Sequence, residues 1–335
     1  MTRPIDVVQF QRRAVPGAFS IERVFEAVRS ALPNDVDVTV QTNKFYSQGV
    51  VTRVLDAMRA RLQCGSVNHV VGDVHYLTWF MPRHKTILTV HDCVSLERLT
   101  GARRWIFWFL WYWLPLHRAG HVTVISEYTR EALLEWIHYP GRIQVIPPPL
   151  SAEFTACPLP PRSALLRLLH VGTKPNKNLL RVIEASSGLP VLLVIIGELT
   201  DEMNDSLRRF AVRFENHVEL DRAELLHQYQ NSHAMVFAST YEGFGLPIIE
   251  AQAVGRPVIT SNVCSMPEAA GGAACLVDPF DVSDIRRGIQ RVIEDPAYCD
   301  ELVRKGYENA AQYAPDRIAA QYAELYRSVH GAERS

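Results

Sequence analysis

Two glycines and two glutamates that could handle an anionic ligand are grouped in residues 238–259, ASTYEGFGLPIIEAQAVGRPVI. Gly243 and Gly245 lie between a strand-like apolar run and a helix-like one. Glycines at such a turn let the backbone approach a ligand closely. The helix start offers N–H groups and a positive partial charge, which suit a phosphate.

The glutamates are Glu242, in the turn, and Glu250, eight residues later in the expected helix. A carboxylate at the second position can accept two hydrogen bonds from a vicinal diol such as a ribose. The combination suggests a nucleotide diphosphate that carries a sugar. The alternative is a surface turn with two solvated glutamates, which the combined pattern disfavours.

Composition and charge exclude several other classes of protein. The 335 residues are 47% hydrophobic and 21% charged, which predicts a globular chain of about two domains. A net charge of −1 provides no general attraction to nucleic acid. The six cysteines contain no C-x-x-C pair, which predicts reduced thiols in a cytosolic protein. We expect no secretory signal and no membrane span, because the longest uncharged apolar run, 105–116, falls short of about 20 residues.

The elements that must position these residues alternate between strand and helix along the chain. This alternation predicts an α/β fold with parallel sheets. The expected strands are residues 5–10, 36–40, 67–71, 86–90, 122–125, 166–171, 191–196, 235–238 and 258–261. The proline-rich segment 146–161 predicts a linker between two similar halves. Ligands bind beyond the carboxyl ends of such strands, so we expect a site in a cleft between the halves.

The stretch EGFGLPIIE, residues 242–250, resembles the E-x7-E signature of retaining glycosyltransferases of family 4, which have the GT-B fold. The segments 170–185 (HVGTKPNKNLLRVIEA) and 255–279 resemble the same family. The N-terminal half matches more weakly, through FSIERVF, TVHD and VISEYTRE.

The resemblance implies two Rossmann-like, doubly wound domains that face a central cleft. Residues 1–155 would bind the acceptor and residues 156–314 the nucleotide sugar. Residues 315–335 would form a C-terminal helix that returns to the first domain.

The family's roles are expected at matching residues of the C-terminal half. Glu242 would contact hydroxyls of the donor sugar, Glu250 would hold the ribose, and Lys177 would neutralise the donor phosphates. A charge-assisted hydrogen bond of this kind stabilises by about 1.5–3 kcal/mol. The backbone that would approach the sugar and diphosphate is that of Gly243, Phe244, Gly245 and Leu246.

One position departs from the family's pattern. Many members have an arginine beside the glycine that ends the first C-terminal strand, where this chain has Thr173 followed by Lys174. We expect Lys174 to supply the second cation at the donor site, the alternative being a solvated loop lysine. Glu268 matches a position near the donor site and could equally cap a helix or form a surface ion pair.

Candidates in the N-terminal half follow strands. Gly17 matches part of a glycine-rich loop near the phosphates, although an ordinary turn fits as well. His91 would hydrogen-bond the donor sugar, and Asp92 would orient His91 or bind the acceptor. His75 also follows a strand and is a weaker candidate. The D-x-D sequence at residues 35–37 lies far from the nucleotide motif and is interpreted as a chance match.

Residues 105–113, WIFWFLWYW, follow Arg103 and Arg104 and predict a helix that is aromatic on every face. Such a helix is usually buried. It could also present part of its surface to a membrane or to a lipid-linked acceptor. We favour a mainly packed helix.

The sequence as a whole predicts a retaining, metal-independent glycosyltransferase without a cofactor. It would move a sugar from a UDP- or GDP-sugar to a glycan or lipid-linked hydroxyl, in bacterial surface polysaccharide or glycolipid synthesis. We expect it in the cytoplasm, with the inner face of the membrane as an option, and without a nucleic-acid partner. The alternatives are a nucleotide-sugar epimerase or hydrolase and a non-catalytic nucleotide-sugar sensor.

Overall fold

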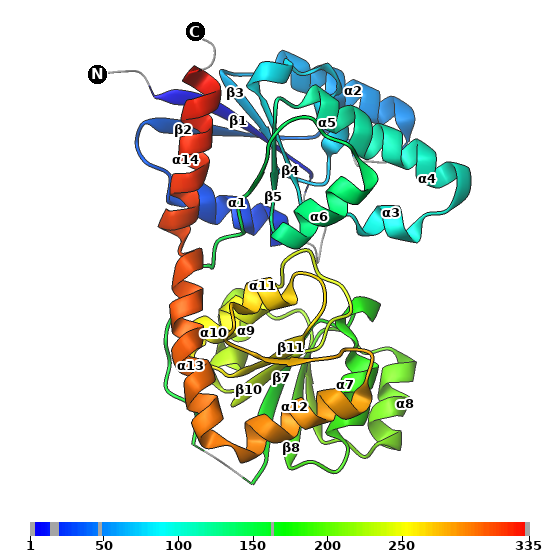
Figure 1. The fold of residues 1–335 in the computed structure, drawn as a ribbon, viewed down its shortest axis with the longest axis vertical. Coiled ribbons are helices and arrows are strands. Elements are labelled where there is room, and N and C mark those ends of the chain that lie inside the picture. Colours follow the sequence, from blue (N-terminus) through cyan, green and yellow to red (C-terminus); the bar gives the residue numbers. More distant parts are fainter. Residues whose placement is uncertain (1–3, 14–19, 46–48, 162–163, 332–335) are drawn as a thin grey trace. The chain divides into compact units, whose positions relative to one another are not determined.

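The computed structural model describes residues 4–13, 20–45, 49–161 and 164–331, which form two compact units (Figure 1). Unit 1 comprises residues 1–149 and 315–335, and unit 2 comprises residues 150–314. Residues 150–155, which the sequence assigns to the first domain, therefore pack with unit 2.

Unit 1 is built on a parallel sheet of six strands in the order β2-β1-β3-β4-β5-β6. The strands are β1 (Ile5–Gln11), β2 (Val36–Thr42), β3 (Val67–Val70), β4 (Thr86–Val90), β5 (His121–Val124) and β6 (Ile143–Val145). The α-helices are α1 (Ser20–Ser30), α2 (Val50–Leu62), α3 (Val94–Arg98), α4 (Gly101–Phe107), α5 (Leu114–Arg118), α6 (Glu127–Trp136) and α14 (Pro315–Gly331). The shorter helical segments are η1 (His75–Phe80), η2 (Arg83–Lys85) and η3 (Trp108–Trp113).

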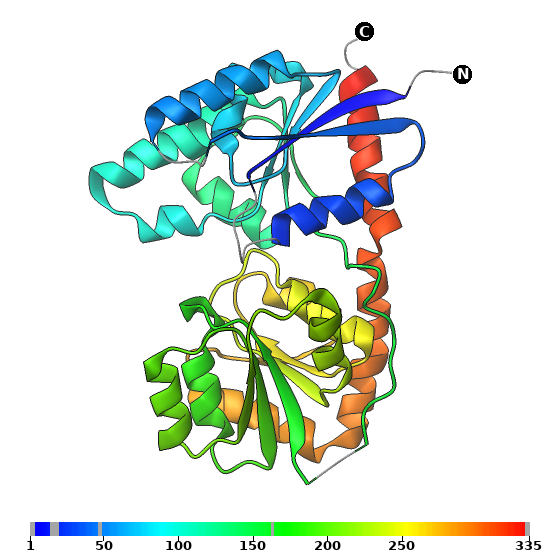
Figure 2. The same ribbon diagram turned by 180° about the vertical axis from the view of Figure 1, so that it is seen from behind.

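The C-terminal helix α14 packs within unit 1 (Figure 2). Its residues Ile318, Tyr322 and Tyr326 are buried against the sheet and α1. The Tyr326 hydroxyl lies 2.8 Å from Nδ1 of His69 and accepts from Gln9 Nε2 at 3.0 Å. Buried polar groups are tolerated when they are hydrogen-bonded, so this network fixes how α14 docks on the sheet.

The aromatic segment forms the middle of a continuous helix over residues 101–118, in which η3 is a π-helical turn. Trp111 and Tyr112 are buried in the core of unit 1. Trp105, Ile106 and Phe109 are exposed. Phe107, Trp108 and Trp113 are partly buried and pack against the same core, so the segment is mainly packed, as expected, and exposes three side chains.

Unit 2 is built on a second parallel six-stranded sheet, in the order β12-β11-β10-β7-β8-β9. The strands are β7 (Leu166–Val171), β8 (Val191–Ile196), β9 (Phe214–His217), β10 (Ala234–Phe237), β11 (Val258–Ser261) and β12 (Cys275–Val277). The helices are η4 (Pro175–Lys177), α7 (Leu179–Ser186), α8 (Asp201–Arg209), α9 (Arg222–Gln230), α10 (Leu246–Val254), α11 (Met266–Ala270), α12 (Val282–Glu294), α13 (Pro296–Ala310) and η5 (Ala311–Tyr313).

Arg256, between α10 and β11, is almost fully buried and connects α9 with the proline-rich segment. Its guanidinium donates to the carbonyls of Tyr229 and Gln230 at the end of α9. It also donates to the carbonyls of Cys157 and Pro158 in the proline-rich segment. A cation at a helix C-terminus is favourable, and backbone carbonyls accept the N–H groups of Arg256, so that the buried guanidinium is satisfied without a carboxylate.

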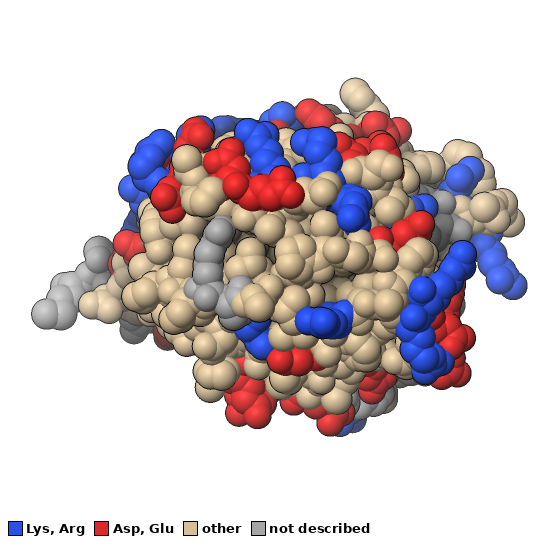
Figure 3. Space-filling view, turned by 90° about the horizontal axis from the view of Figure 1, so that it is seen from below, with Lys and Arg blue, Asp and Glu red and all other residues tan. Residues whose placement is uncertain are grey.

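Charged side chains of both signs are interspersed on the molecular face drawn in Figure 3, without a large area of one sign. This distribution agrees with the net charge of −1.

Candidate active site

The candidate site in unit 2 is formed by two loops that follow neighbouring strands. Residues 172–178 follow β7, and residues 238–245 follow β10, which pairs with β7. Because the strands are parallel, both loops leave the sheet at its carboxyl edge. The Thr240 amide donates to the Asn176 carbonyl at 2.8 Å, which joins the loops directly.

Lys177 and Glu242 meet where these loops join. Lys177 Nζ lies 2.6 Å from Glu242 Oε1, and both side chains are partly exposed. The same ammonium lies 4.6 Å from the ring centroid of Phe237, within the range of a cation–π contact. The structure thus brings together two residues that the sequence predicts for donor binding.

Two glycines allow this geometry. Gly172 has φ +93°, and a Cβ there would lie 3.0 Å from Cγ of Lys177. The aliphatic part of Lys177 therefore packs against the backbone of Gly172, where any larger residue would crowd it. Gly245 has φ +107° and precedes the first residue of α10, Leu246. A left-handed conformation of this kind is costly for other residues.

Two asparagines hold the lysine loop in place. Asn176 Nδ2 donates to the Tyr241 carbonyl at 3.0 Å and to Glu242 Oε1 at 3.2 Å. Asn178 adopts φ 62°, a left-handed conformation that asparagine tolerates. Its side chain is buried and donates to the carbonyls of Ala238 and Pro279. This role could not be predicted from the sequence, because both asparagines act through contacts with residues more than 50 positions away.

The turn between Glu242 and α10 is held by a residue of the loop that follows the neighbouring strand β11. Ser265, just before α11, has its hydroxyl 2.8 Å from the Glu242 carbonyl and 2.9 Å from that of Phe244. Phe244 is buried and packs edge-on against Tyr313 at 5.3 Å between ring centroids. Phe244 is therefore a packing residue of the turn, and any ligand contact from it would come from its backbone.

Glu250 lies in the middle of α10 and is held by Tyr229 of α9. The Tyr229 hydroxyl donates to Glu250 Oε2 at 2.6 Å. Burial raises the pKa of Glu250, and this hydrogen bond opposes the rise by favouring the carboxylate. Sequence reasoning missed Tyr229, because the partner of a helix residue on the preceding helix has no local signal.

The remaining candidates of unit 2 lie around the same edge. Thr173 follows Gly172 and lies against Gly197, just after β8. A Cβ added to Gly197 would be only 2.9 Å from Oγ1 of Thr173. Lys174 is exposed and precedes η4. Gly243 is part of the turn itself, and Glu268 lies in α11, partly exposed.

In unit 1, His91 and Asp92 follow β4 directly. His91 Nε2 lies 2.8 Å from the Val71 carbonyl, so this nitrogen carries the proton and Nδ1 is the acceptor. Burial lowers the pKa of His91 and keeps the ring neutral. Asp92 accepts at 3.1 Å from the amide of Val94, the first residue of α3, and burial raises the pKa of Asp92.

The other N-terminal candidates are accounted for differently. His75 is buried with Nδ1 2.8 Å from the Trp111 carbonyl, which is a core position. Asp35 of the D-x-D sequence forms an ion pair with Arg327 at 2.8 Å. Gly17 lies outside the described residues. Across the described ranges, no group of three or more His, Cys, Asp or Glu side chains is placed to hold a metal ion.

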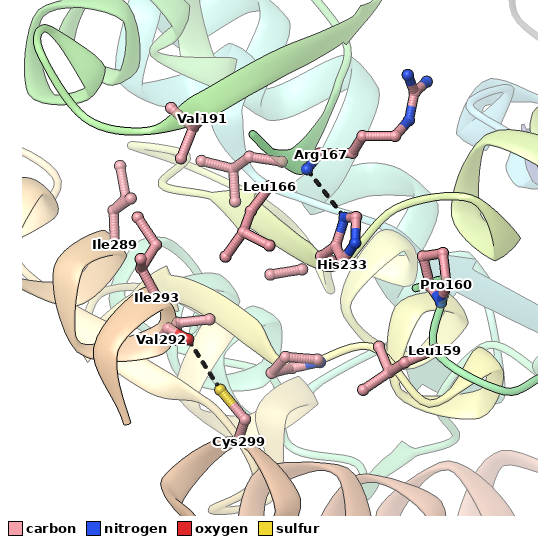
Figure 4. A pocket seen from close by; sticks show the side chains of 13 residues that line it. Leu159, Pro160, Leu166, Arg167, Val191, His233, Ile289, Val292, Ile293 and Cys299 are labelled. Carbon is pink, nitrogen blue, oxygen red and sulfur yellow. Dashed lines mark hydrogen bonds between the residues drawn. The ribbon is translucent and has the colours of Figure 1, made fainter. Parts of the chain in front are cut away.

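A separate pocket of unit 2 is shown in Figure 4. Leu166 and Val191 line it at the amino ends of β7 and β8, so it lies at the edge of the sheet opposite to the candidate site. Its walls are mostly apolar, and its volume of about 70 Å³ is far below that of usual ligand sites. This pocket is therefore not a candidate for a nucleotide sugar.

Comparison with known proteins begins with two family models. The model of Glycosyltransferase Family 4 matches residues 50–154, and the model of Glycosyl transferases group 1 matches residues 167–311. Within the described residues, none of the helices combines the length and hydropathy needed to cross a bilayer.

Relatives with curated names are glycosyltransferases. O-antigen chain mannosyltransferase B of Escherichia coli is 27% identical over 237 residues, which cover 63% of this chain and 61% of the relative. Serotype-specific mannosyltransferase WbdA of Escherichia coli is 25% identical over 264 residues, 69% of this chain and 32% of the relative. The chain thus spans less than two thirds of the length of these relatives.

Solved structures show the same fold. Sucrose-phosphate synthase from Thermosynechococcus elongatus superposes with a TM-score of 0.75 at 19% identity, covering 98% of this chain and 100% of that one. Anabaena Alr3699/HepE in complex with UDP and glucose has a TM-score of 0.75 at 16% identity, with 97% and 100% coverage. The fold is that of the GT-B glycosyltransferases, which confirms the predicted fold class. With both family models matched as well, the chain belongs to the GT4-type glycosyltransferases.

Proposed function

We propose that this protein is a retaining glycosyltransferase that moves a sugar from a UDP- or GDP-sugar to a hydroxyl of a glycan or lipid-linked acceptor. The observation that carries the proposal is the 2.6 Å contact between Lys177 Nζ and Glu242 Oε1 at the carboxyl edge of the unit 2 sheet. It places a cation and a carboxylate beside the start of α10, where backbone N–H groups favour phosphate.

In the proposed donor complex, the diphosphate competes with Glu242 for the Lys177 ammonium. Glu242 then accepts hydrogen bonds from sugar hydroxyls, and Asn176, which already contacts it at 3.2 Å, keeps it at the junction of the loops. Glu250, held by Tyr229, binds the ribose diol. Lys174 is proposed as the second cation, because its exposed side chain can reach an incoming phosphate without losing a buried contact.

The proposed reaction breaks the bond between the anomeric carbon and the leaving phosphate oxygen. The acceptor oxygen forms its bond on the same face, and its proton passes to the leaving phosphate, so that a nucleoside diphosphate and a new glycoside result. Catalysis then depends on positioning and on stabilising charge at the leaving phosphate. The protein supplies the Lys177 ammonium for this charge, and we propose that no metal ion is required.

The acceptor is proposed to be a growing surface polysaccharide, since two relatives are named O-antigen chain and serotype-specific mannosyltransferases. Mannose is therefore the first donor sugar to test. His91, with Nδ1 as its accepting nitrogen, and Asp92 are the unit 1 residues proposed to contact the substrates.

A thermal-shift screen of nucleotide sugars tests donor binding first. A donor at 100 times its dissociation constant stabilises the folded protein by about 2.7 kcal/mol, so the true donor should stand out. The donor is then incubated with candidate acceptors, and the anomeric configuration of the product is measured by NMR. A product with inverted configuration would overturn the retaining mechanism. Donor interconversion without acceptor would indicate an epimerase, release of free sugar a hydrolase, and tight binding without turnover a sensor.

A further inference from the structure

Helix α2 of unit 1 has an apolar stripe on its outer side. Val51, Leu55, Met58 and Leu62 recur at helical spacing, so their side chains lie on one face. Val51 is 72% exposed and Leu62 is 87% exposed. The buried face of the same helix is formed by Asp56, Ala57 and Ala60. The helix is therefore apolar on the side that faces away from the core, which is unusual for a surface helix.

Arginines lie on both sides of this stripe. At 100° per residue, Arg59 and Arg61 project about 80° to either side of the stripe's centre. Both side chains are exposed. Asp56, the acidic residue of α2, is buried and accepts from the amides of Lys44 and Phe45. The outer face of α2 thus combines apolar side chains with positive charge.

A second exposed apolar group lies on the neighbouring helix. Trp105 is 65% exposed and Ile106 61% exposed on α4, directly after Arg103 and Arg104. Residues 101–118 contain no aspartate or glutamate. Figures 1 and 2 both show α2 beside α4 and α5 on unit 1. The Arg53 guanidinium of α2 lies 4.7 Å from the ring centroid of Trp111, in the π-helical turn η3 that continues α4.

We propose that the outer stripe of α2 together with Trp105 and Ile106 of α4 is a docking surface for an anionic lipid bilayer. Apolar side chains would enter the boundary between headgroups and acyl chains, and the arginines would reach lipid phosphates while their stems cover apolar surface. Tryptophan is favoured at that depth because its ring has both an apolar body and a polar N–H.

The charges favour a bilayer over a second copy of the chain. A symmetric dimer through this surface would bring arginines of one copy toward arginines of the other, and like charges across an interface are unfavourable. Anionic headgroups complement the same arginines. The proposal concerns binding alone and does not depend on glycosyl transfer.

Co-sedimentation with vesicles tests the proposal, without nucleotide sugar or acceptor in the assay. We expect the protein to bind vesicles of equal parts phosphatidylglycerol and phosphatidylcholine, and to bind phosphatidylcholine vesicles far more weakly. Arg59→Ser/Arg61→Ser should reduce partitioning about fivefold for each arginine removed. Leu55→Ser/Met58→Ser should reduce it by about tenfold or more, because the apolar area that enters the bilayer is lost.

Val218→Ser/Leu276→Ser is the matched control, since both residues are exposed apolar side chains of unit 2. It should bind vesicles like the unmodified chain, and all three variants should unfold at the same temperature. Equal binding by the α2 variants and the control would overturn the proposal. So would a protein that stays in the supernatant, or a dimer in sedimentation velocity that Leu55→Ser/Met58→Ser converts to a monomer. Because donor binding is measured separately, failure here leaves the proposed transfer activity untouched.

Discussion

The hydroxyl of Tyr229 donates a 2.6 Å hydrogen bond to Oε2 of Glu250, so the carboxylate proposed to bind ribose is oriented by the preceding helix. Tyr229 is itself fully buried, and its pKa lies well above that of a free tyrosine because of burial and the adjacent carboxylate. Its proton therefore stays on the hydroxyl, which donates to the carboxylate of Glu250.

Tyr229→Phe removes this bond and leaves the ring in place. We expect donor affinity to fall about tenfold, because Glu250 loses its orientation, and stability to fall by about 1 kcal/mol. Isothermal titration with the donor and urea unfolding measure the two effects. The pKa of Glu250 should rise further in the variant, since the hydrogen bond favours the charged form. Unchanged affinity would contradict the orienting role of Tyr229 in donor binding.

Lys177→Ala should lower kcat/KM by about two to three orders of magnitude, as expected for the loss of about 2.7–4 kcal/mol of transition-state stabilisation. Lys174→Ala is the companion variant, and its smaller loss should appear mainly in KM. Steady-state kinetics with saturating acceptor separate the two. Near-normal turnover by Lys177→Ala would remove the lysine from the mechanism.

Arg256→Met is expected to destabilise unit 2 strongly. The substitution removes the guanidinium that donates to the carbonyls of Gln230, Cys157 and Pro158, and each unsatisfied polar group that is buried costs about 1–3 kcal/mol. We expect a loss of at least about 3 kcal/mol in the free energy of unfolding, measured by denaturant titration. Arg213→Met, at an exposed position, is the control and should change stability by less than about 0.5 kcal/mol. Equal stability of the two variants would contradict this role of Arg256.

Mild acid should destabilise the protein through its buried histidines. Burial lowers the pKa of His69 to about 3 and that of His170 to about 4. The unfolded chain takes up protons below about pH 6.5, and the folded chain does not. The contribution of these histidines to the free energy of unfolding is therefore fully present above about pH 6.5. It decreases as the pH falls, by up to about 1.4 kcal/mol per pH unit for each histidine.

Thermal unfolding between pH 7 and pH 5 measures this loss, since most carboxylates stay ionised there. His69→Gln removes one titrating group, and its melting temperature should depend less steeply on pH than that of the unmodified protein, whatever its absolute value. Equal slopes would show that His69 is protonated in the folded state.

Strands in the interior of each sheet could be predicted well from the sequence. The predictions for β4, β7, β8 and β11 agree with the structure to the residue. These strands are apolar and β-branched because both of their faces are covered by helices. The edge strands β6, β9 and β12 were missed, because a strand such as Phe214–His217, with the sequence FENH, is short and partly exposed.

Lys177 and Glu242 could be singled out because each lies in a loop after a strand, and Glu250 because it follows Glu242 at a fixed spacing in the next helix. Their partners could not, because Tyr229 and Ser265 act through contacts between elements that are distant in sequence. The π-helical turn at residues 108–113 could not be predicted either. It changes which aromatic side chains face the core, and a segment that is aromatic at nearly every position has no periodic pattern to reveal this.

The most direct test of the account is a crystal structure of the protein soaked with a nucleotide-sugar analogue that cannot react. The account predicts pyrophosphate density within hydrogen-bonding distance of Lys177 Nζ and of the backbone at the start of α10, with the ribose diol on Glu250. Density at another place, such as the apolar pocket at the opposite edge of the sheet, or Glu250 facing away from the ribose, would contradict it.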